Sequence, residues 1–209
     1  MIQFIIEVFV NLFVIIDPIA VVPMFVLLTH HDTPLQKQKT ALKACLIGAG
    51  ILTVFGVVGD GFLTILGISG PAFQIAGGIL LMLVAIDMVV AKHSGISSTT
   101  MDEEREAIRR SDVSVFPLAI PLIAGPGAMT SIILQMRSVE DDIIKQGAVI
   151  ATMLTVLIVT YAFLRWASFV TRLLGVTGTN VITRVFGIII AALAVQFIVD
   201  GIKTGFALS

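Results

Sequence analysis

The chain has 209 residues, of which 57% are hydrophobic and only 13% are charged, and its mean hydropathy is +1.05. Soluble domains carry about 25% charged residues, so this composition excludes an ordinary soluble protein and predicts a polytopic membrane protein. The single cysteine, Cys45, excludes an internal disulfide, and a net charge of −1 points to no particular partner.

Apolar segments long enough to cross a bilayer recur six times along the chain. A transmembrane helix needs about 20 mostly apolar residues. Such segments lie near residues 4–28, 41–66, 71–91, 113–136, 147–165 and 180–203. The sequence therefore predicts an all-α membrane protein with six transmembrane helices. The N-terminus is expected to be a retained first span, because it lacks the basic region of a signal peptide.

The first predicted span carries a carboxylate and two prolines in its middle. Asp17 is followed by Pro18, and Pro23 comes five residues later. A helix in hydrocarbon avoids both features, because a buried charge is costly and each proline removes a backbone hydrogen bond. Such an interruption is tolerated where protein or a water-filled cavity surrounds it, so Asp17-Pro18 predicts an interior site. Asp17 before a proline is equally a good N-cap for a resuming half-helix, and the two interpretations are compatible.

Glycine-rich sequences are expected to shape the ends of other spans. Residues 66–71 and residues 174–178 each predict a turn between two spans. Gly59-Asp60-Gly61 is expected to interrupt the second span near its end. Residues 92–112 form the one long polar linker, in which Thr100 and Glu103 fit the capping-box pattern of a helix start.

An internal repeat relates the two halves of the chain. A shift of 108 residues places residues 17–20 on residues 125–128, and residues 66–70 on residues 174–178. Each unit holds an odd number of spans, so the second unit must lie upside down relative to the first. The sequence thus predicts two inverted three-helix repeats, at 1–91 and 113–209, in which helices 1 and 4 are broken. Paired interruptions of this kind are typical of transport sites, and the alternative is that proline and glycine only kink and pack the helices.

Basic residues are distributed unevenly between the two sides of the predicted membrane protein. Ten of the 13 lie on the side of the first, third and fifth loops, and the other three are Arg137, Lys145 and Lys203. Because cytoplasmic loops carry the excess of lysine and arginine, linker 92–112 is predicted to be cytoplasmic. Both termini are then expected on the periplasmic side of a bacterial inner membrane.

The paired interruptions define a candidate substrate or ion site. Asp17 is predicted to carry a proton, bind a cation or bind a substrate amine, while Pro18 shapes the helix around it. Gly125-Pro126-Gly127 predicts a half-helix start whose free N–H groups favour an anion. Close packing against a neighbouring helix is the alternative explanation for these glycines.

Three further polar residues lie within predicted spans. Asn11 and Thr130 are candidate lining residues, although such side chains more often bond to a neighbouring helix. Asp87, near the end of the third span, is a secondary candidate, and contact with water or headgroups is its alternative role. Together with the interrupted segments, these residues complete the predicted site.

Other chemistries lack their sequence signatures. The chain has no His-Glu-x-x-His zinc motif and no phosphate-binding glycine loop with a lysine. No catalytic residue, metal ligand or cofactor is therefore predicted, and the chain is expected not to be an enzyme. The expected partners are the lipid bilayer and a small-molecule or ion substrate, without nucleic acid, and homo-oligomerisation is left open.

The interrupted spans carry a resemblance to a known family. Asn11-Leu12-Phe13 leading into Asp17-Pro18, followed later by Pro117, Pro121 and residues 125–128, resembles the MarC family of integral membrane proteins. The resemblance covers essentially the whole chain. It implies a six-span bacterial inner-membrane protein grouped with LysE-type exporters, and it carries over no catalytic residue.

Two functional hypotheses follow from the sequence. The leading one is a secondary transporter, an exporter of a small solute, with its site between the first and fourth spans. The alternative is a non-transporting membrane scaffold or accessory subunit that binds a cytoplasmic partner through linker 92–112.

Overall fold

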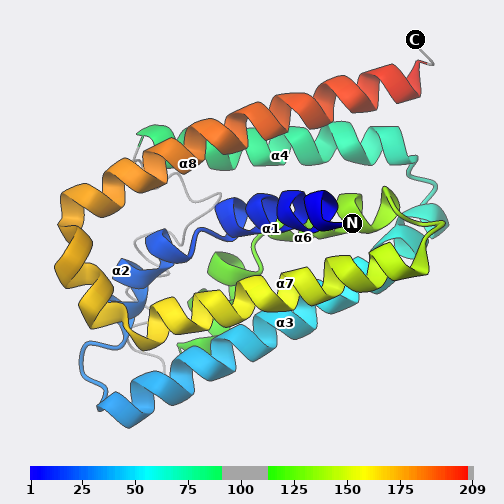
Figure 1. Cartoon of the computed structure of the whole chain (residues 1–209). Helices are drawn as coiled ribbons and strands as arrows, with labels where there is room; N and C mark the ends of the chain where they lie inside the picture. Colours follow the sequence, from blue (N-terminus) through cyan, green and yellow to red (C-terminus); the bar gives the residue numbers. More distant parts are fainter. Residues whose placement is uncertain (91–112, 207–209) are drawn as a thin grey trace.

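A computed structural model describes residues 1–90 and 113–206, and every regular element within these ranges is a helix (Figure 1). The predicted all-α fold class is therefore confirmed for the described residues. Linker 92–112, with its predicted capping box at Thr100, lies outside them.

The helices fall before and after the linker. The first group is α1 (Ile2–Ile16), α2 (Pro18–Leu28), α3 (Pro34–Ile65) and α4 (Gly70–Val90). The second group is η1 (Ser114–Ile123), α6 (Pro126–Arg137), α7 (Ile143–Arg165) and α8 (Ala167–Gly205). The α3–α4 and α6–α7 turns lie at one end of the molecule, and the α2–α3 connection lies at the other (Figure 1).

Five helical stretches of the described residues are long and apolar enough to cross a membrane. They are Ile2–Leu28, Pro34–Ile65, Gly70–Val90, Ile143–Arg165 and Thr177–Gly205. A sixth arises if η1 and α6, which are bent by 55° relative to each other, form one span. The structure thus contains five or six candidate spans in the order that the hydropathy pattern predicts.

One expectation about a glycine-rich segment needs correction, and another is confirmed. The predicted interruption at Gly59-Asp60-Gly61 is wrong, because α3 continues unbroken to Ile65. A Cβ atom placed on Gly59 would lie 2.7 Å from Cγ1 of Ile133, so this glycine serves close packing against α6. Residues 174–178 do form the predicted turn: Gly175, with φ of 61°, is non-helical, and it separates two helical segments that meet at a kink within α8 (Ala167–Gly205).

The α3–α4 connection does form the predicted turn. Gly67 adopts φ of 69°, a left-handed conformation that favours glycine. The N–H of Ile68 donates to the Leu63 carbonyl at 2.9 Å, which closes the turn after the last residues of α3. A glycine at this position ends the helix because it accepts the left-handed backbone without steric cost.

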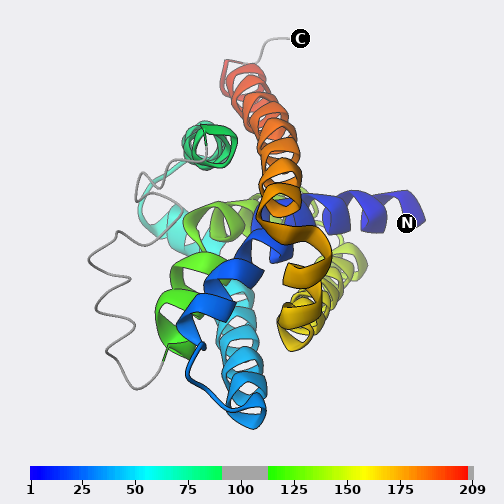
Figure 2. The ribbon, with the colours of Figure 1, turned by 90° about the vertical axis from the view of Figure 1, so that its left-hand side faces the viewer.

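Small residues bring the helices together in two pairs. Helix α4 lies side by side with α8, where Gly78 faces Ala194, while α3 lies beside α7 and packs against η1 through Gly48 (Figure 1). Helix α1 lies between these pairs and is inclined to their long axis, as the view along the bundle shows (Figure 2). Tight helix contacts in a membrane depend on such small side chains.

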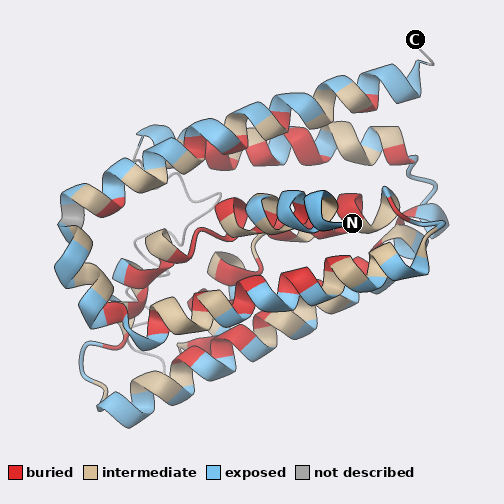
Figure 3. Cartoon of the chain, in the orientation of Figure 1, coloured by how far each residue is buried: buried red, intermediate tan, exposed pale blue. Residues whose placement is uncertain are grey.

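Burial follows this arrangement. The helix sides that face one another are buried, and the outer sides are exposed (Figure 3). Among the exposed residues are large apolar side chains such as Val57 and Ile188, which are 63% and 62% exposed. An apolar exterior around a partly polar interior fits a surface that contacts lipid.

Candidate functional site

Helices α1 and α2 meet at Asp17, and residues 16–18 are called the Asp17 junction. Asp17 has φ of 43° and ψ of 69°, a left-handed conformation that aspartate tolerates better than most residues. Its N–H donates to the Phe13 carbonyl at 3.0 Å and completes α1. Pro18 has no N–H to continue the hydrogen-bond pattern, so the chain restarts there as α2.

The two oxygens of the Asp17 carboxylate have different surroundings. Oδ1 accepts the N–H of Ala20 at 3.2 Å and so caps α2, as one of the two sequence interpretations expects. Oδ2 is buried and has no hydrogen-bond partner among the described residues. The residue is only 4% exposed, so the carboxylate faces the interior of the protein. A buried polar atom without a partner is costly, and this distinguishes Oδ2 from the capping oxygen Oδ1.

Thr183 of α8 lies opposite this carboxylate. Its hydroxyl interacts with the Asp17 carboxylate, and no other group of the described residues bonds to the buried Oγ1. Two helices distant in sequence therefore place a hydroxyl and a carboxylate at the same buried position. The sequence reasoning missed Thr183, because a hydroxyl in an apolar helix commonly bonds to its own backbone and carries no distinctive signal.

Helices η1 and α6 meet at Gly125, and residues 124–126 are called the Gly125 junction. Phe116 and Ile120 have extended backbone angles within η1, each directly before one of its prolines. Gly125 is extended, with φ of −74° and ψ of 170°, and Pro126 opens α6. No side chain of the described residues caps α6, so its first N–H groups lack the capping partner that Asp17 gives to α2.

The end of α1 meets the start of α6 at Gly127. A Cβ atom placed there would lie 3.5 Å from Cγ2 of Ile15, two residues before Asp17, and 3.1 Å from Cδ2 of Leu81 on α4. The first turn of α6 therefore packs directly against the end of α1. Glycine permits this approach, which agrees with the close-packing interpretation of residues 125–127.

The other predicted site residues lie on α1, α4 and α6. Thr130 is 4% exposed, but it packs against Gly77 of α4. Asn11 is half-buried on α1, and Asp87 is half-buried on α4, one helical turn beyond Val84. The structure thus places Ile15, two residues before Asp17, against Gly127, while functional roles for all the predicted site residues stay predictions.

A second buried polar group lies on α6, and the sequence reasoning missed it. Gln135 donates from Nε2 to Oγ of Ser131 at 3.0 Å, while its Oε1 is buried and has no partner among the described residues. Both residues follow Gly127 at four-residue spacing, which keeps them near the helix face that meets α1. A glutamine within a predicted span was the sequence feature that could have indicated this buried polar group.

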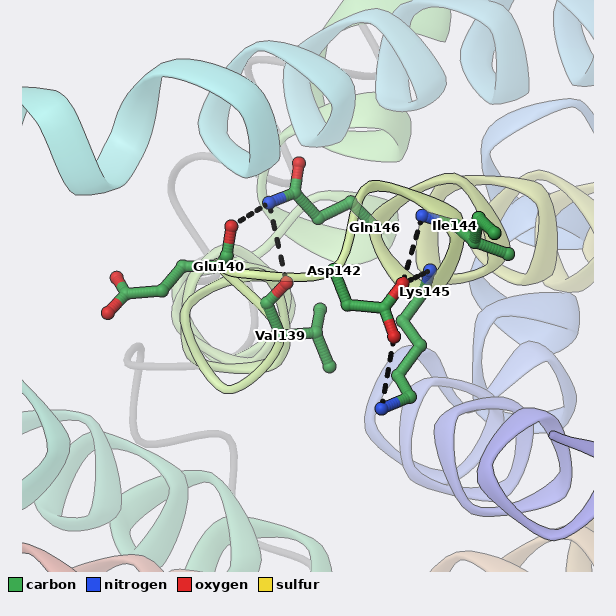
Figure 4. Close-up of polar contacts among 6 residues, drawn as sticks. All are labelled: Val139, Glu140, Asp142, Ile144, Lys145 and Gln146. Atoms are coloured by element: carbon green, nitrogen blue, oxygen red, sulfur yellow. Dashed lines mark hydrogen bonds and ion pairs between the residues drawn. The ribbon is translucent and has the colours of Figure 1, made fainter.

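The end of the molecule near the α6–α7 turn is held by polar contacts. Arg137 pairs with Asp60 of α3 at 2.6 Å, with both side chains about one third exposed. In the turn, Asp142 caps α7 by accepting the N–H groups of Ile144 and Lys145, each at 3.1 Å (Figure 4). The N–H of Lys145, and then its ammonium group, hold the pKa of Asp142 below its usual range.

The fold and the buried junctions define a multi-pass helical membrane protein. Comparison with known proteins shows that the chain belongs to the MarC family, because the family model "MarC family integral membrane protein" matches residues 2–206. The resemblance seen in the sequence is thereby confirmed.

Relatives from distant organisms are similar to this chain in sequence over nearly its whole length. The UPF0056 membrane protein YvbG of Bacillus subtilis is 35% identical over 203 residues, which cover 97% of this chain and 96% of the relative. The UPF0056 membrane protein YhcE of Escherichia coli is 37% identical over 195 residues, covering 93% and 90%. A UPF0056 membrane protein of Aquifex aeolicus is 35% identical over 204 residues, covering 95% and 92%. No solved structure matches the chain.

Proposed function

We propose that the chain is a secondary transporter that exports a small solute and is not an enzyme. The observation that carries this proposal is the unpartnered Oδ2 of Asp17, buried at the end of α1, two residues after the side chain of Ile15 that packs against the first turn of α6. Discontinuous helices whose ends meet inside a membrane protein are typical of transporter sites.

In this proposal, each residue of the two junctions has a defined role. Asp17 is the residue that responds to the ion or the solute. Pro18, Gly125, Pro126 and Gly127 shape the interrupted helices. The free N–H groups at the start of α6 offer a complementary site for an anionic or carbonyl group of the solute.

We further propose that α1–α4 and η1–α8 are inverted repeats. The 108-residue offset that relates the two junctions in sequence supports this arrangement. Alternation of the two units about the Asp17 junction then exposes the site to either side of the membrane in turn. The excess of basic residues on one set of loops supports a cytoplasmic linker and periplasmic termini in a bacterial inner membrane.

Solute efflux from proteoliposomes tests the proposal. Vesicles loaded with a mixture of small amines, carboxylates and neutral metabolites are followed by mass spectrometry, with protein-free vesicles as the baseline. The wild type is compared with Asp17→Asn and with Asp200→Asn. Asp200 is a matched control because its carboxylate bonds to Gln196 at 2.8 and 2.9 Å near the C-terminal end of α8.

We expect at least one solute to leave faster with the wild type and with Asp200→Asn, and to lose this acceleration in Asp17→Asn. Unaccelerated efflux of every solute, or equal efflux in Asp17→Asn, contradicts the proposal. Deleting residues 92–112 distinguishes a transporter from the scaffold alternative, because a transporter retains solute flux without the linker.

A further inference from the structure

We infer that the Asp17 junction binds a singly charged cation, held by the Asp17 carboxylate, the Thr183 hydroxyl and the carbonyl end of α1. This inference rests on the proposed function and deepens it by naming the class of ion that acts at the site. Three groups of oxygen atoms from two separate helices carry it.

The carboxylate supplies the charge. Asp17 is 4% exposed, and the ion pairs of the described residues do not include it. The Ala20 N–H satisfies Oδ1 alone, and Oδ2 has no partner. A buried carboxylate is stable when a positive charge lies beside it, so Oδ2 marks the position of a cation.

The end of α1 supplies carbonyl oxygens. Only the Phe13 carbonyl is used by the junction, through the N–H of Asp17. The Val14 carbonyl would bond to residue 18, which is a proline, and the N–H groups of Ala20 and Val21 turn instead to the carbonyl of Asp17. The last carbonyls of α1 are therefore free of backbone donors. Helix C-terminal ends carry partial negative charge, and such ends coordinate cations in interrupted transporter helices.

Thr183 closes the site from α8. Its buried hydroxyl interacts with the Asp17 carboxylate and with no other group of the described residues. A hydroxyl oxygen can contribute a lone pair to a cation while its hydrogen points elsewhere. The hydroxyl hydrogen is available to the Asp17 carboxylate, and the lone pairs of Oγ1 are then available to a cation beside the two groups.

The charge of the site selects a singly charged ligand. One carboxylate balances one positive charge, and a divalent ion would leave an excess charge in the protein interior. The N-terminal end of α2 adds partial positive charge beside Asp17, which opposes a second positive charge further. Oxygen ligands suit alkali cations and also the N–H donors of a small ammonium group.

Thermal unfolding of the purified full chain in lipid nanodiscs tests this inference without any transported solute. Sodium, potassium and methylammonium chloride are titrated separately, with choline chloride maintaining the ionic strength. The three arms distinguish an alkali ion from an organic ammonium ligand. The variants are Asp17→Asn, Thr183→Val and the conservative Thr183→Ser, and Asp200→Asn is the control.

We expect at least one of the three cations to raise the melting temperature with a saturating dose dependence. Asp17→Asn abolishes this shift, and Thr183→Val weakens the apparent affinity by about tenfold, the size expected for one lost oxygen contact to a charged ligand. Thr183→Ser and Asp200→Asn retain wild-type affinity. Retention in Thr183→Ser shows that the effect of Thr183→Val does not come from misfolding.

The inference is overturned if none of the three cations acts beyond choline, if the shift persists in Asp17→Asn, or if Thr183→Val binds as tightly as the wild type. These outcomes are separate from those of the efflux experiment. Solute efflux that depends on Asp17 but on none of the three cations overturns the cation site and leaves the transporter proposal standing. Cation binding without solute efflux supports the cation site and overturns the transporter proposal.

Discussion

Replacing Gly78 with alanine tests whether α4 and α8 are held together by backbone contact. A Cβ atom at Gly78 would lie 2.7 Å from the Ala194 carbonyl oxygen and 2.6 Å from Cγ1 of Ile198. Carbon and carbonyl oxygen atoms normally approach to about 3.3 Å, so α8 has to move by roughly 0.6 Å. The obstructing oxygen belongs to the backbone and cannot rotate away as a flexible side chain can.

Two opposing effects set the magnitude. Overpacking of this kind costs about 1–3 kcal/mol, while alanine is a better helix former than glycine by about 1 kcal/mol. Gly50 on α3 is the matched control, because a Cβ atom there meets nothing within 4 Å. Gly50→Ala shows the helix-propensity gain alone, so the difference between the two variants isolates the packing cost of about 1–3 kcal/mol.

Reversible unfolding in mixed detergent micelles measures both variants against the wild type. We expect Gly78→Ala to be less stable than Gly50→Ala by that amount. If Gly78→Ala is as stable as Gly50→Ala, the close approach of α4 and α8 is refuted. The same pair of helices positions Thr183, so Gly78→Ala is also expected to weaken cation binding.

Three further predictions concern contacts away from the junctions. Asp60→Asn removes the partner of Arg137 and lowers the free energy of unfolding by about 1 kcal/mol or less, because the pair is partly exposed; a loss that does not shrink in high salt contradicts the ion-pair explanation. Phe13→Leu removes edge-to-face contacts with Phe163 and Phe186, whose ring centroids lie 6.3 and 6.0 Å away, and costs about 1–2 kcal/mol in the same unfolding assay; an unchanged free energy would show that the rings do not interact. Because the pKa of Asp142 is lowered in the folded protein, its contribution is complete above the unfolded value near 3.9 and is lost as pH falls through the lower folded value; melting temperatures of Asp142→Asn should therefore decline less in acid than those of the wild type, and parallel curves would contradict this.

The sequence was most informative where the signal was local. Long apolar segments predict membrane helices without knowledge of their neighbours, and the structure contains five or six such spans in that order. Asp17 stood out for a similar reason, since a carboxylate beside proline in an apolar segment is costly wherever it lies. Its burial and its cap on α2 agree with that expectation.

The sequence was least informative where the role of a residue depends on a distant partner. Gly59 was expected to interrupt α3, yet its neighbour Ile133 on α6 makes it a packing residue instead. Thr183 could not be identified as a site residue from the sequence, because its importance comes from its position on α8 opposite Asp17, which ends α1. Glycine and threonine are common in membrane helices, so only the fold separates the packing glycine and the candidate ligand from the rest.

Disulfide cross-linking of the end of α1 to the start of α6 tests the central structural claim most directly. Ile15→Cys and Gly127→Cys are combined in a Cys45→Ala background, which removes the one native cysteine, and native membranes are oxidised before denaturing electrophoresis. Ile15 Cγ2 lies 3.5 Å from a Cβ atom on Gly127, and a cysteine at residue 15 carries its sulfur at a γ position, so the two cysteine side chains come close enough to test for a disulfide. We predict rapid intramolecular cross-linking of this pair and none of the control pair Ile15→Cys with Gly50→Cys. Equal or absent cross-linking in the two pairs would contradict a site built where the end of α1 meets the start of α6.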